Sequence, residues 1–189
     1  MLQNLLDPSS RAANGQPASD SLVRLADGRL VSIQSEALRL LGQLPPEELA
    51  RYRREFGPKA DALLKEAGEN HDLQGIVSVA TRFFHTDAGQ NAANFLGTYH
   101  FDRGEFGMAA RWFAQLAAVR APVLQDPKWR LKAAFALQQS GRRQDAEALV
   151  AADSALDAVA PLEVGGVRVR PSEPVKMSGG RPCRACPRT

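Results

Sequence analysis

The sequence is poor in residues that metal and redox sites require. Its 189 residues include only two cysteines, Cys183 and Cys186, which form a C-x-x-C pair close to the end. A structural zinc ion normally needs four ligands, and no second cysteine pair is present. A thioredoxin-type pair is expected at a helix start, whereas this pair follows Pro- and Gly-rich sequence. We expect adventitious thiols and predict no metal or cofactor; metal binding and redox chemistry remain the alternatives.

Sequence motifs of catalysis are equally scarce. Of the three histidines, we expect His71 at a turn, His85 at a helix start beside a capping Thr86, and His100 within a helix. No serine stands in a G-x-S-x-G context, and no glycine-rich loop is suited to cradle a phosphate. The sequence therefore predicts a non-enzymatic protein without catalytic residues.

Long apolar runs are also missing. No uninterrupted stretch approaches the roughly 18 residues that a membrane span requires. The start, "MLQNLLDPSSRAANG", has neither the basic residues nor the long apolar core of a secretory signal. As given, the chain is expected to be soluble and cytoplasmic; an export signal lost from the start would instead place it in the periplasm or envelope.

Positive charge is concentrated at the C-terminus. The net charge is +3, but from Arg168 onward six basic residues face only Glu173, so this part carries +5 and the rest −2. Since the rest is nearly neutral, we expect no nucleic-acid partner; a tail that binds nucleic acid or metal is the alternative. The segment 156–189 is basic and rich in proline and glycine, which predicts a solvated, disordered tail.

What the sequence does contain is amphipathic helical pattern. The stretch Asn94–Phe113 has two apolar-periodic halves around Gly104, with Phe95, Leu96 and Tyr99 on one side of the first half. Similar pairs of helices flank turns near His71 and Gly141. We expect Trp112 and Trp129 to pack in the core or between hairpins. One hairpin cannot bury its apolar face alone, so neighbouring hairpins are expected to stack on it.

The spacing of these turns resembles that of tetratricopeptide repeats. The three turns are 33 and 37 residues apart, close to the roughly 34-residue period of that family. The middle hairpin matches best, at Leu96, Gly97, Gly104, Phe106, Ala109 and Phe113. We predict an all-α solenoid of about three tetratricopeptide-like hairpins over residues 58–155, with an ordinary bundle of hairpins as the alternative.

A different pattern precedes the hairpins. Residues 1–19 are expected to be disordered, and residues 20–57 to hold a short β-hairpin followed by helices. The turn signal Asp27-Gly28 predicts a ribbon over residues 21–34, and Ser35 is expected to cap the next helix. The run "PPEE" predicts a further helix start at residues 45–48, and "GP" at residues 57–58 predicts that this helix ends there.

Several short motifs resemble one bacterial family. The runs "DGRLVSIQ", "FGPKA", "HTDAG" and "LGTYHFDRG" are similar to the segment that precedes the propeller in bacterial pyrroloquinoline-quinone-type β-propeller proteins, including outer-membrane-assembly lipoproteins. The resemblance runs from about Asp20 to Val169. No run of short strands follows Val169, so a quinone- or propeller-borne activity is not implied. The resemblance leaves an alternative, in which the chain is an N-terminal fragment whose activity lies in a missing domain.

The expected solenoid suggests a binding surface for a protein or peptide. In such folds the first helices of successive hairpins line the concave side. Polar residues on those helices that point away from the second helix are candidates for partner binding: Asn91, Asn94, Thr98 and Asp102 in the middle hairpin, and Arg130 and Gln138 in the last. The sequence thus predicts an interaction scaffold.

Overall fold

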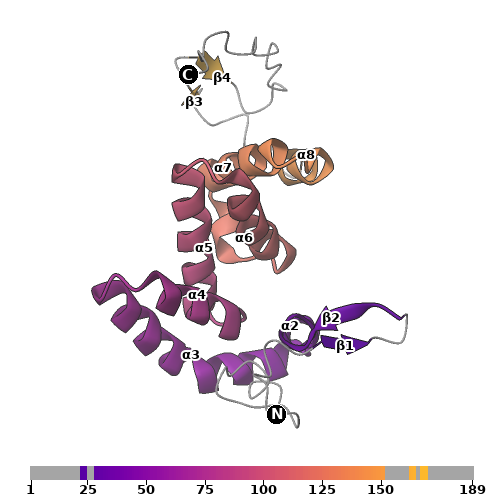
Figure 1. The fold of residues 1–189 in the computed structure, drawn as a ribbon, viewed down its shortest axis with the longest axis vertical. Coiled ribbons are helices and arrows are strands. Elements are labelled where there is room, and N and C mark those ends of the chain that lie inside the picture. The colour runs from indigo at the N-terminus through magenta and orange to yellow at the C-terminus, as the bar shows by residue number, and fades with distance from the viewer. Residues whose placement is uncertain (1–21, 25–27, 152–161, 165–166, 170–189) are drawn as a thin grey trace, which may run out of the picture.

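The computed structural model describes residues 22–24, 28–151, 162–164 and 167–169, and these are mostly helical (Figure 1). The helices are α2 (Ile33–Gly42), α3 (Pro46–Glu69), α4 (Leu73–Arg82), α5 (Asp87–Asp102), α6 (Phe106–Ala118), the short 3₁₀ helix η2 (Pro122–Gln125), α7 (Pro127–Gln139) and α8 (Arg143–Ala151). The strands are β1 (Leu22–Arg24), β2 (Leu30–Ser32), β3 (Leu162–Val164) and β4 (Val167–Val169). This helical content confirms the all-α class.

Three helix pairs, α3–α4, α5–α6 and α7–α8, follow one another as hairpins with the same turn. The turn residues His71, Gly104 and Gly141 have φ values of 53°, 75° and 83°. Each turn also has a backbone N–H bonded to the carbonyl five residues earlier: Asp72 to Ala67, Glu105 to His100 and Arg142 to Leu137. These are helix C-terminal motifs that need a left-handed residue. The turns predicted from the sequence are therefore confirmed, including the one built on histidine.

The core lies along α5 and the helices packed on it. Leu96 and Phe113 are fully buried, and Trp129 is 3% exposed. The close approach of α5 and α6 depends on Gly97, where an added Cβ would lie 2.5 Å from Cε1 of Phe113. The ring of Phe113 meets the Trp129 ring edge to face at 5.4 Å, so the middle hairpin is packed directly against α7. Trp112 is partly buried against the same core, as expected.

Helix α3 corrects one prediction. Residues Gly57 and Pro58 lie inside this helix, so the predicted helix end at "GP" is wrong, and the predicted boundary between residues 57 and 58 falls within α3. Proline removes one intrahelical hydrogen bond, to the carbonyl of Arg54. Both Arg54 and Pro58 are exposed, so water can solvate that carbonyl. On either side of Pro58 the helix remains packed through the buried residues Tyr52 and Ala60. This packing outweighs the local preference of Gly-Pro to end a helix.

Strands β1 and β2 and helix α2 form the N-terminal unit. The strands pair antiparallel, with Val23 opposite Val31, as the hairpin prediction required. The cap of α2 is Ser32, whose hydroxyl accepts from the N–H of Ser35, so the prediction that Ser35 is the cap is wrong. Ser35 lies three residues further along, inside the first turn, because the helix starts directly after β2.

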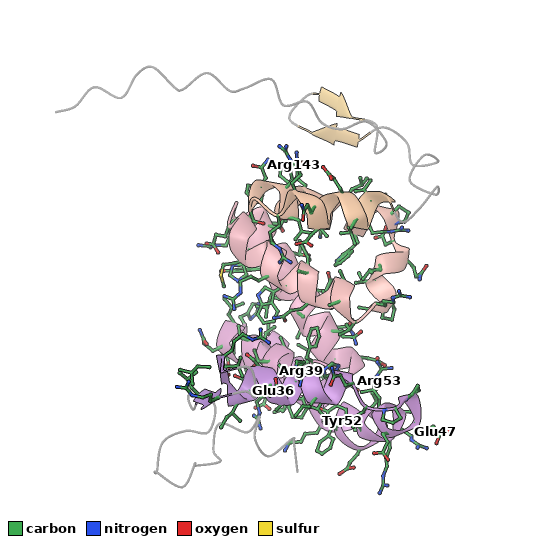
Figure 2. All side chains as sticks on the ribbon, turned by 90° about the vertical axis from the view of Figure 1, so that its right-hand side faces the viewer. Glu36, Arg39, Glu47, Tyr52, Arg53 and Arg143 are labelled. Carbon is green, nitrogen blue, oxygen red and sulfur yellow. The ribbon has the colours of Figure 1, made fainter. Side chains whose placement is uncertain are left out.

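Helix α2 packs on the start of α3 through a small second core. Ala37 and Leu41 are buried against Tyr52, whose ring lies 5.0 Å from that of Phe56. Burial raises the pKa of Tyr52 to about 12. Figure 2 shows Tyr52, with Glu36 and Arg39 of α2, toward one end of the helical part, and Arg143 of α8 at the other.

The predicted disordered segments lie mostly outside the described residues. Residues 1–19 are among these, and so is most of the tail 156–189. Within the tail, β3 and β4 pair antiparallel, which differs from the disorder expected there. The sequence signal for this hairpin is two valine-containing runs, "LEV" and "VRV", separated by Gly-Gly. Among the described helices, none is both long and apolar enough to cross a membrane.

Candidate functional site

The outer side of α5 carries four residues at helical spacing: Asn91, Phe95, Thr98 and Asp102. We call these four residues the α5 face. Asn91 and Asp102 are exposed, and Thr98 is half-buried. Phe95 is 50% exposed, and it is the aromatic residue among the exposed large hydrophobic side chains of the described residues. The sequence placed Phe95 on the packed side with Leu96, and this prediction is wrong for Phe95.

Aromatic and cationic groups extend this face toward the end of α5. The ring of Phe95 stacks on Tyr99 with centroids 6.4 Å apart, and the guanidinium of Arg103 lies 5.3 Å from the Tyr99 ring. Stacking on Tyr99 restricts the orientation of Phe95 while leaving half of its surface in contact with water. A rigid, exposed aromatic side chain of this kind is typical of interaction sites.

Two of the sequence-predicted residues hold α5 to α7. The Oδ1 atom of Asn94 accepts a hydrogen bond of 2.7 Å from Nε1 of Trp129, and Oγ1 of Thr98 accepts one of 2.9 Å from Nζ of Lys132. The amide of Asn94 satisfies the indole N–H of a buried tryptophan, which would otherwise cost about 1–3 kcal/mol. Asn94 and Thr98 therefore have a structural role, whether or not they also contact a partner.

The two candidates on α7 are placed differently from the expectation. Arg130 is 8% exposed and Gln138 is half-buried, so neither presents a well-exposed side chain. The exposed residues of α7 are Lys128 and Gln139, which lie on another side of the helix. The expected exposure of Arg130 is wrong. Apolar residues lie on more than one side of α7, so their spacing in the sequence alone did not show which side faces α8.

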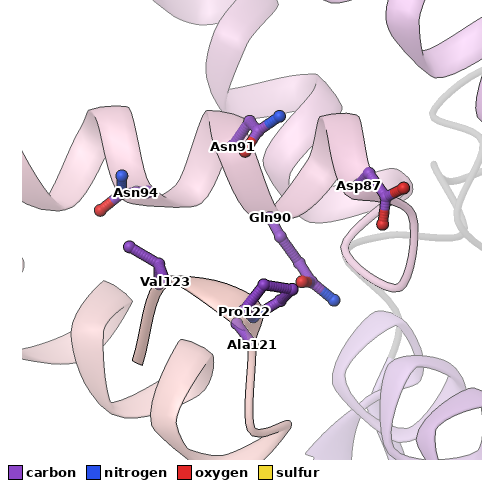
Figure 3. Close-up of a pocket in the computed structure, with 7 residues that line it drawn as sticks. All are labelled: Asp87, Gln90, Asn91, Asn94, Ala121, Pro122 and Val123. Carbon is purple, nitrogen blue, oxygen red and sulfur yellow. The ribbon is translucent and has the colours of Figure 1, made fainter. Parts of the chain in front are cut away.

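A hollow lies between the first half of α5 and the segment around η2 (Figure 3). We call it the α5 hollow; it has a volume of about 130 Å³ and is lined by Asp87, Gln90, Asn91, Asn94, Ala121, Pro122 and Val123. Its α5 side is polar and its other side, residues 121–123, is apolar. The connection from α6 to α7 spans eight residues against four between α4 and α5, and η2 accounts for the difference. The extra residues explain why the second turn spacing is 37 residues and not 33.

Gln90 is the unusual residue of the α5 hollow. Its side chain is 6% exposed and extends from α5 toward Pro122 in Figure 3. Within the part of the chain that the structure describes, its amide group has no hydrogen-bond partner. Its amide oxygen and nitrogen are not among the fully enclosed polar atoms that lack a partner, so the amide meets solvent at the hollow and can bond a group that enters it. Sequence reasoning missed Gln90 because nothing in the pattern places residue 122 beside it.

His85 joins three segments and is 4% exposed. Its Nε2 donates a 2.8 Å hydrogen bond to the carbonyl of Leu38 in α2, and its own carbonyl accepts one of 2.9 Å from Nε of Arg53 in α3. Burial is the main cause that lowers the pKa of His85; the bond to Leu38 opposes it and the charge of Arg53 adds to it. The imidazole therefore links α2 to the segment before α5, and burial favours its neutral form, in line with the capping and turn role expected for residues 85–87. Thr86 caps α5 by accepting from the N–H of Gly89.

A polar network closes the α5–α6 turn. Nδ1 of His100 lies 2.6 Å from Oε2 of Glu105, and Nε of Arg103 lies 3.1 Å from Oε1. The hydrogen bonds from His100 and then Arg103 lower the pKa of Glu105. The group is mostly exposed, and its hydrogen bonds join the end of α5 to the residue before α6.

Within the residues that the structure describes, no group of three or more His, Cys, Asp and Glu side chains comes close enough to hold a metal ion. Cys183 and Cys186 lie outside those residues. In comparisons with known proteins, no family model, curated protein or solved structure matches this chain. The α5 face and the α5 hollow are therefore the two candidate sites.

Proposed function

We propose that the chain is a non-enzymatic scaffold whose stacked, tetratricopeptide-like hairpins bind a protein or peptide partner along α5. The observation that carries the proposal is Phe95, half exposed at the centre of the middle hairpin and flanked one helical turn away by Asn91 and Thr98. An aromatic anchor surrounded by amide and hydroxyl groups is the composition that protein interfaces favour.

The α5 hollow also favours a macromolecular partner over a small molecule. Its volume of about 130 Å³ is below the roughly 300 Å³ at which pockets for small ligands begin. A hollow of this size accommodates about one side chain. It can contribute to binding only as one contact among several along an extended surface, which is how a segment of a partner protein would use it.

The test starts from a random peptide library displayed on phage and selected on the full chain. Enriched peptides are then titrated against Phe95→Asp and against a matched control, Met108→Asp, which changes an exposed apolar residue on α6 that is 42% exposed. We expect Phe95→Asp to weaken binding about tenfold or more, and Met108→Asp to leave it unchanged. Circular dichroism confirms that both variants stay folded. Equal binding to both variants, or a selection that enriches nothing, would contradict the proposal.

A further inference from the structure

The lining of the α5 hollow has two chemically different sides. Ala121, Pro122 and Val123 present apolar surface, while Asp87 and the amide of Gln90 present oxygen acceptors. Asp87 is exposed, and its carboxylate has neither an ion pair nor a hydrogen bond to the described part of the chain. It is the charged residue of the lining, so the hollow favours a cation.

We infer that the α5 hollow binds a lysine or arginine side chain of the partner, and so selects partners by a basic residue. These side chains combine an apolar stem with a cationic end. The stem fits against Pro122 and Val123, and the cationic end reaches the carboxylate of Asp87 and the amide oxygen of Gln90. The volume of about 130 Å³ suits one such side chain. This inference rests on the proposed function and names the chemistry that the partner carries.

The arrangement also fixes where the basic residue lies in the partner. Asn91, in the hollow, and Phe95, on the α5 face, are one helical turn apart, or about 6 Å at 1.5 Å per residue. An extended peptide advances about 3.3 Å per residue. A segment that lies along α5 therefore places its basic residue about two positions from the residue that contacts Phe95, with the order set by the direction in which it lies.

Peptides selected on the wild-type chain provide the test. We expect an excess of lysine or arginine about two positions from an apolar residue. Asp87→Asn should weaken these peptides about fivefold, the scale of one exposed ion pair. Asp61→Asn is the matched control, because it removes an exposed carboxylate on α3 that does not line the hollow. A lysine-to-norleucine change in the peptide should produce the same loss in the wild type and no further loss in Asp87→Asn.

A charge reversal guards against a loss caused by misfolding. A selection repeated on Asp87→Lys should enrich acidic residues where the wild type enriched basic ones, a gain that an unfolded variant cannot show. Peptides that depend on Phe95 but lack a basic preference, or that bind Asp87→Asn and wild type equally, would overturn the inference and leave the proposed function intact. Peptides that bind independently of Phe95, or no enriched peptides at all, would remove the proposed function and this inference together.

Discussion

The α5–α6 hairpin and the N-terminal unit are attached to the rest of the molecule by different contacts. Within the hairpin, apolar packing holds the helices together: Leu96 and Phe113 are fully buried, and Gly97 lets α5 and α6 approach closely. The N-terminal unit is held by a small apolar cluster and by the hydrogen bond from His85 to Leu38. The stability that comes from apolar close packing does not depend on pH, but it falls when a buried side chain is truncated. A hydrogen bond through a titratable side chain tolerates small changes in the packing around it, but its contribution depends on pH.

The largest effect is expected from truncating Phe113. Its side chain is fully buried between Gly97 and Trp129, so Phe113→Ala leaves a cavity that the neighbouring helices cannot close by moving together. We expect a loss of about 3–5 kcal/mol in the free energy of unfolding, measured by urea denaturation with circular dichroism. Met108→Ala, at an exposed site on the same helix, should cost less than about 1 kcal/mol. Similar losses for the two variants would mean that the middle hairpin is not the core.

The next test compares two glycines of the same hairpin. Gly97→Ala brings a methyl group to 2.5 Å from the Phe113 ring and should cost about 1–3 kcal/mol. Gly107→Ala, in α6, meets no atom within 4 Å and should stabilise the protein by about 0.5–1 kcal/mol, because alanine favours the helix. Thermal unfolding of the two variants should therefore shift in opposite directions. A shift of both variants to higher temperature would show that helix propensity, and not the close approach at Gly97, decides the outcome.

Much of the helical framework follows from the sequence because its signals are local. Gly104 and Gly141 mark turns that need a left-handed residue, and the same spacing located the turn at His71. Pro58 was misassigned because packing on both sides of it outweighs the loss of one hydrogen bond. Ser35 was misassigned because the end of the preceding strand decides which residue caps the helix. The sequence offers two serines, Ser32 and Ser35, and does not show where that strand ends.

The candidate site was less predictable, since exposure depends on neighbouring helices. The outward positions of Asn91 and Asp102 followed from helical spacing. The same spacing places Phe95 between them, four residues after Asn91 and seven before Asp102. The sequence therefore contained the signal for its exposure, but Phe95 was assigned to the packed side because it is hydrophobic. The α5 hollow depends on how the connection carrying η2 folds back on α5, and no residue pattern encodes that contact.

The link through His85 predicts that the attachment of the N-terminal unit depends on pH. Because burial lowers the pKa of His85 in the folded state, the unfolded chain binds more protons as the pH falls through about 6.5. The contribution of His85 is therefore complete above about pH 6.5 and is lost at lower pH. We expect amide hydrogen exchange in α2 to accelerate between about pH 7 and about pH 5, after correction for intrinsic exchange, more than in α6.

His85→Gln separates titration from the loss of a hydrogen bond. Glutamine can donate to the Leu38 carbonyl but does not titrate, so the variant should keep α2 protected and lose most of the difference between the two pH values. Glu105, whose pKa is also lowered, contributes in the same direction at lower pH and at the other end of α5. Equal pH dependence of α2 exchange in both proteins would show that another group controls the attachment.

The smallest effect is expected at the cap of α2, where it should stay local. The Ser32 hydroxyl accepts the N–H of Ser35 at 3.3 Å, so Ser32→Ala should cost about 0.5–1 kcal/mol. Ser35→Ala is the matched control: the residue is exposed and its hydroxyl caps nothing, so a change near zero is expected. Hydrogen exchange should accelerate in the first turn of α2 in Ser32→Ala and remain unchanged in α5 and α6. If exchange also accelerated in the middle hairpin, the N-terminal unit and the hairpin would unfold together, and their different contacts would not make them independent.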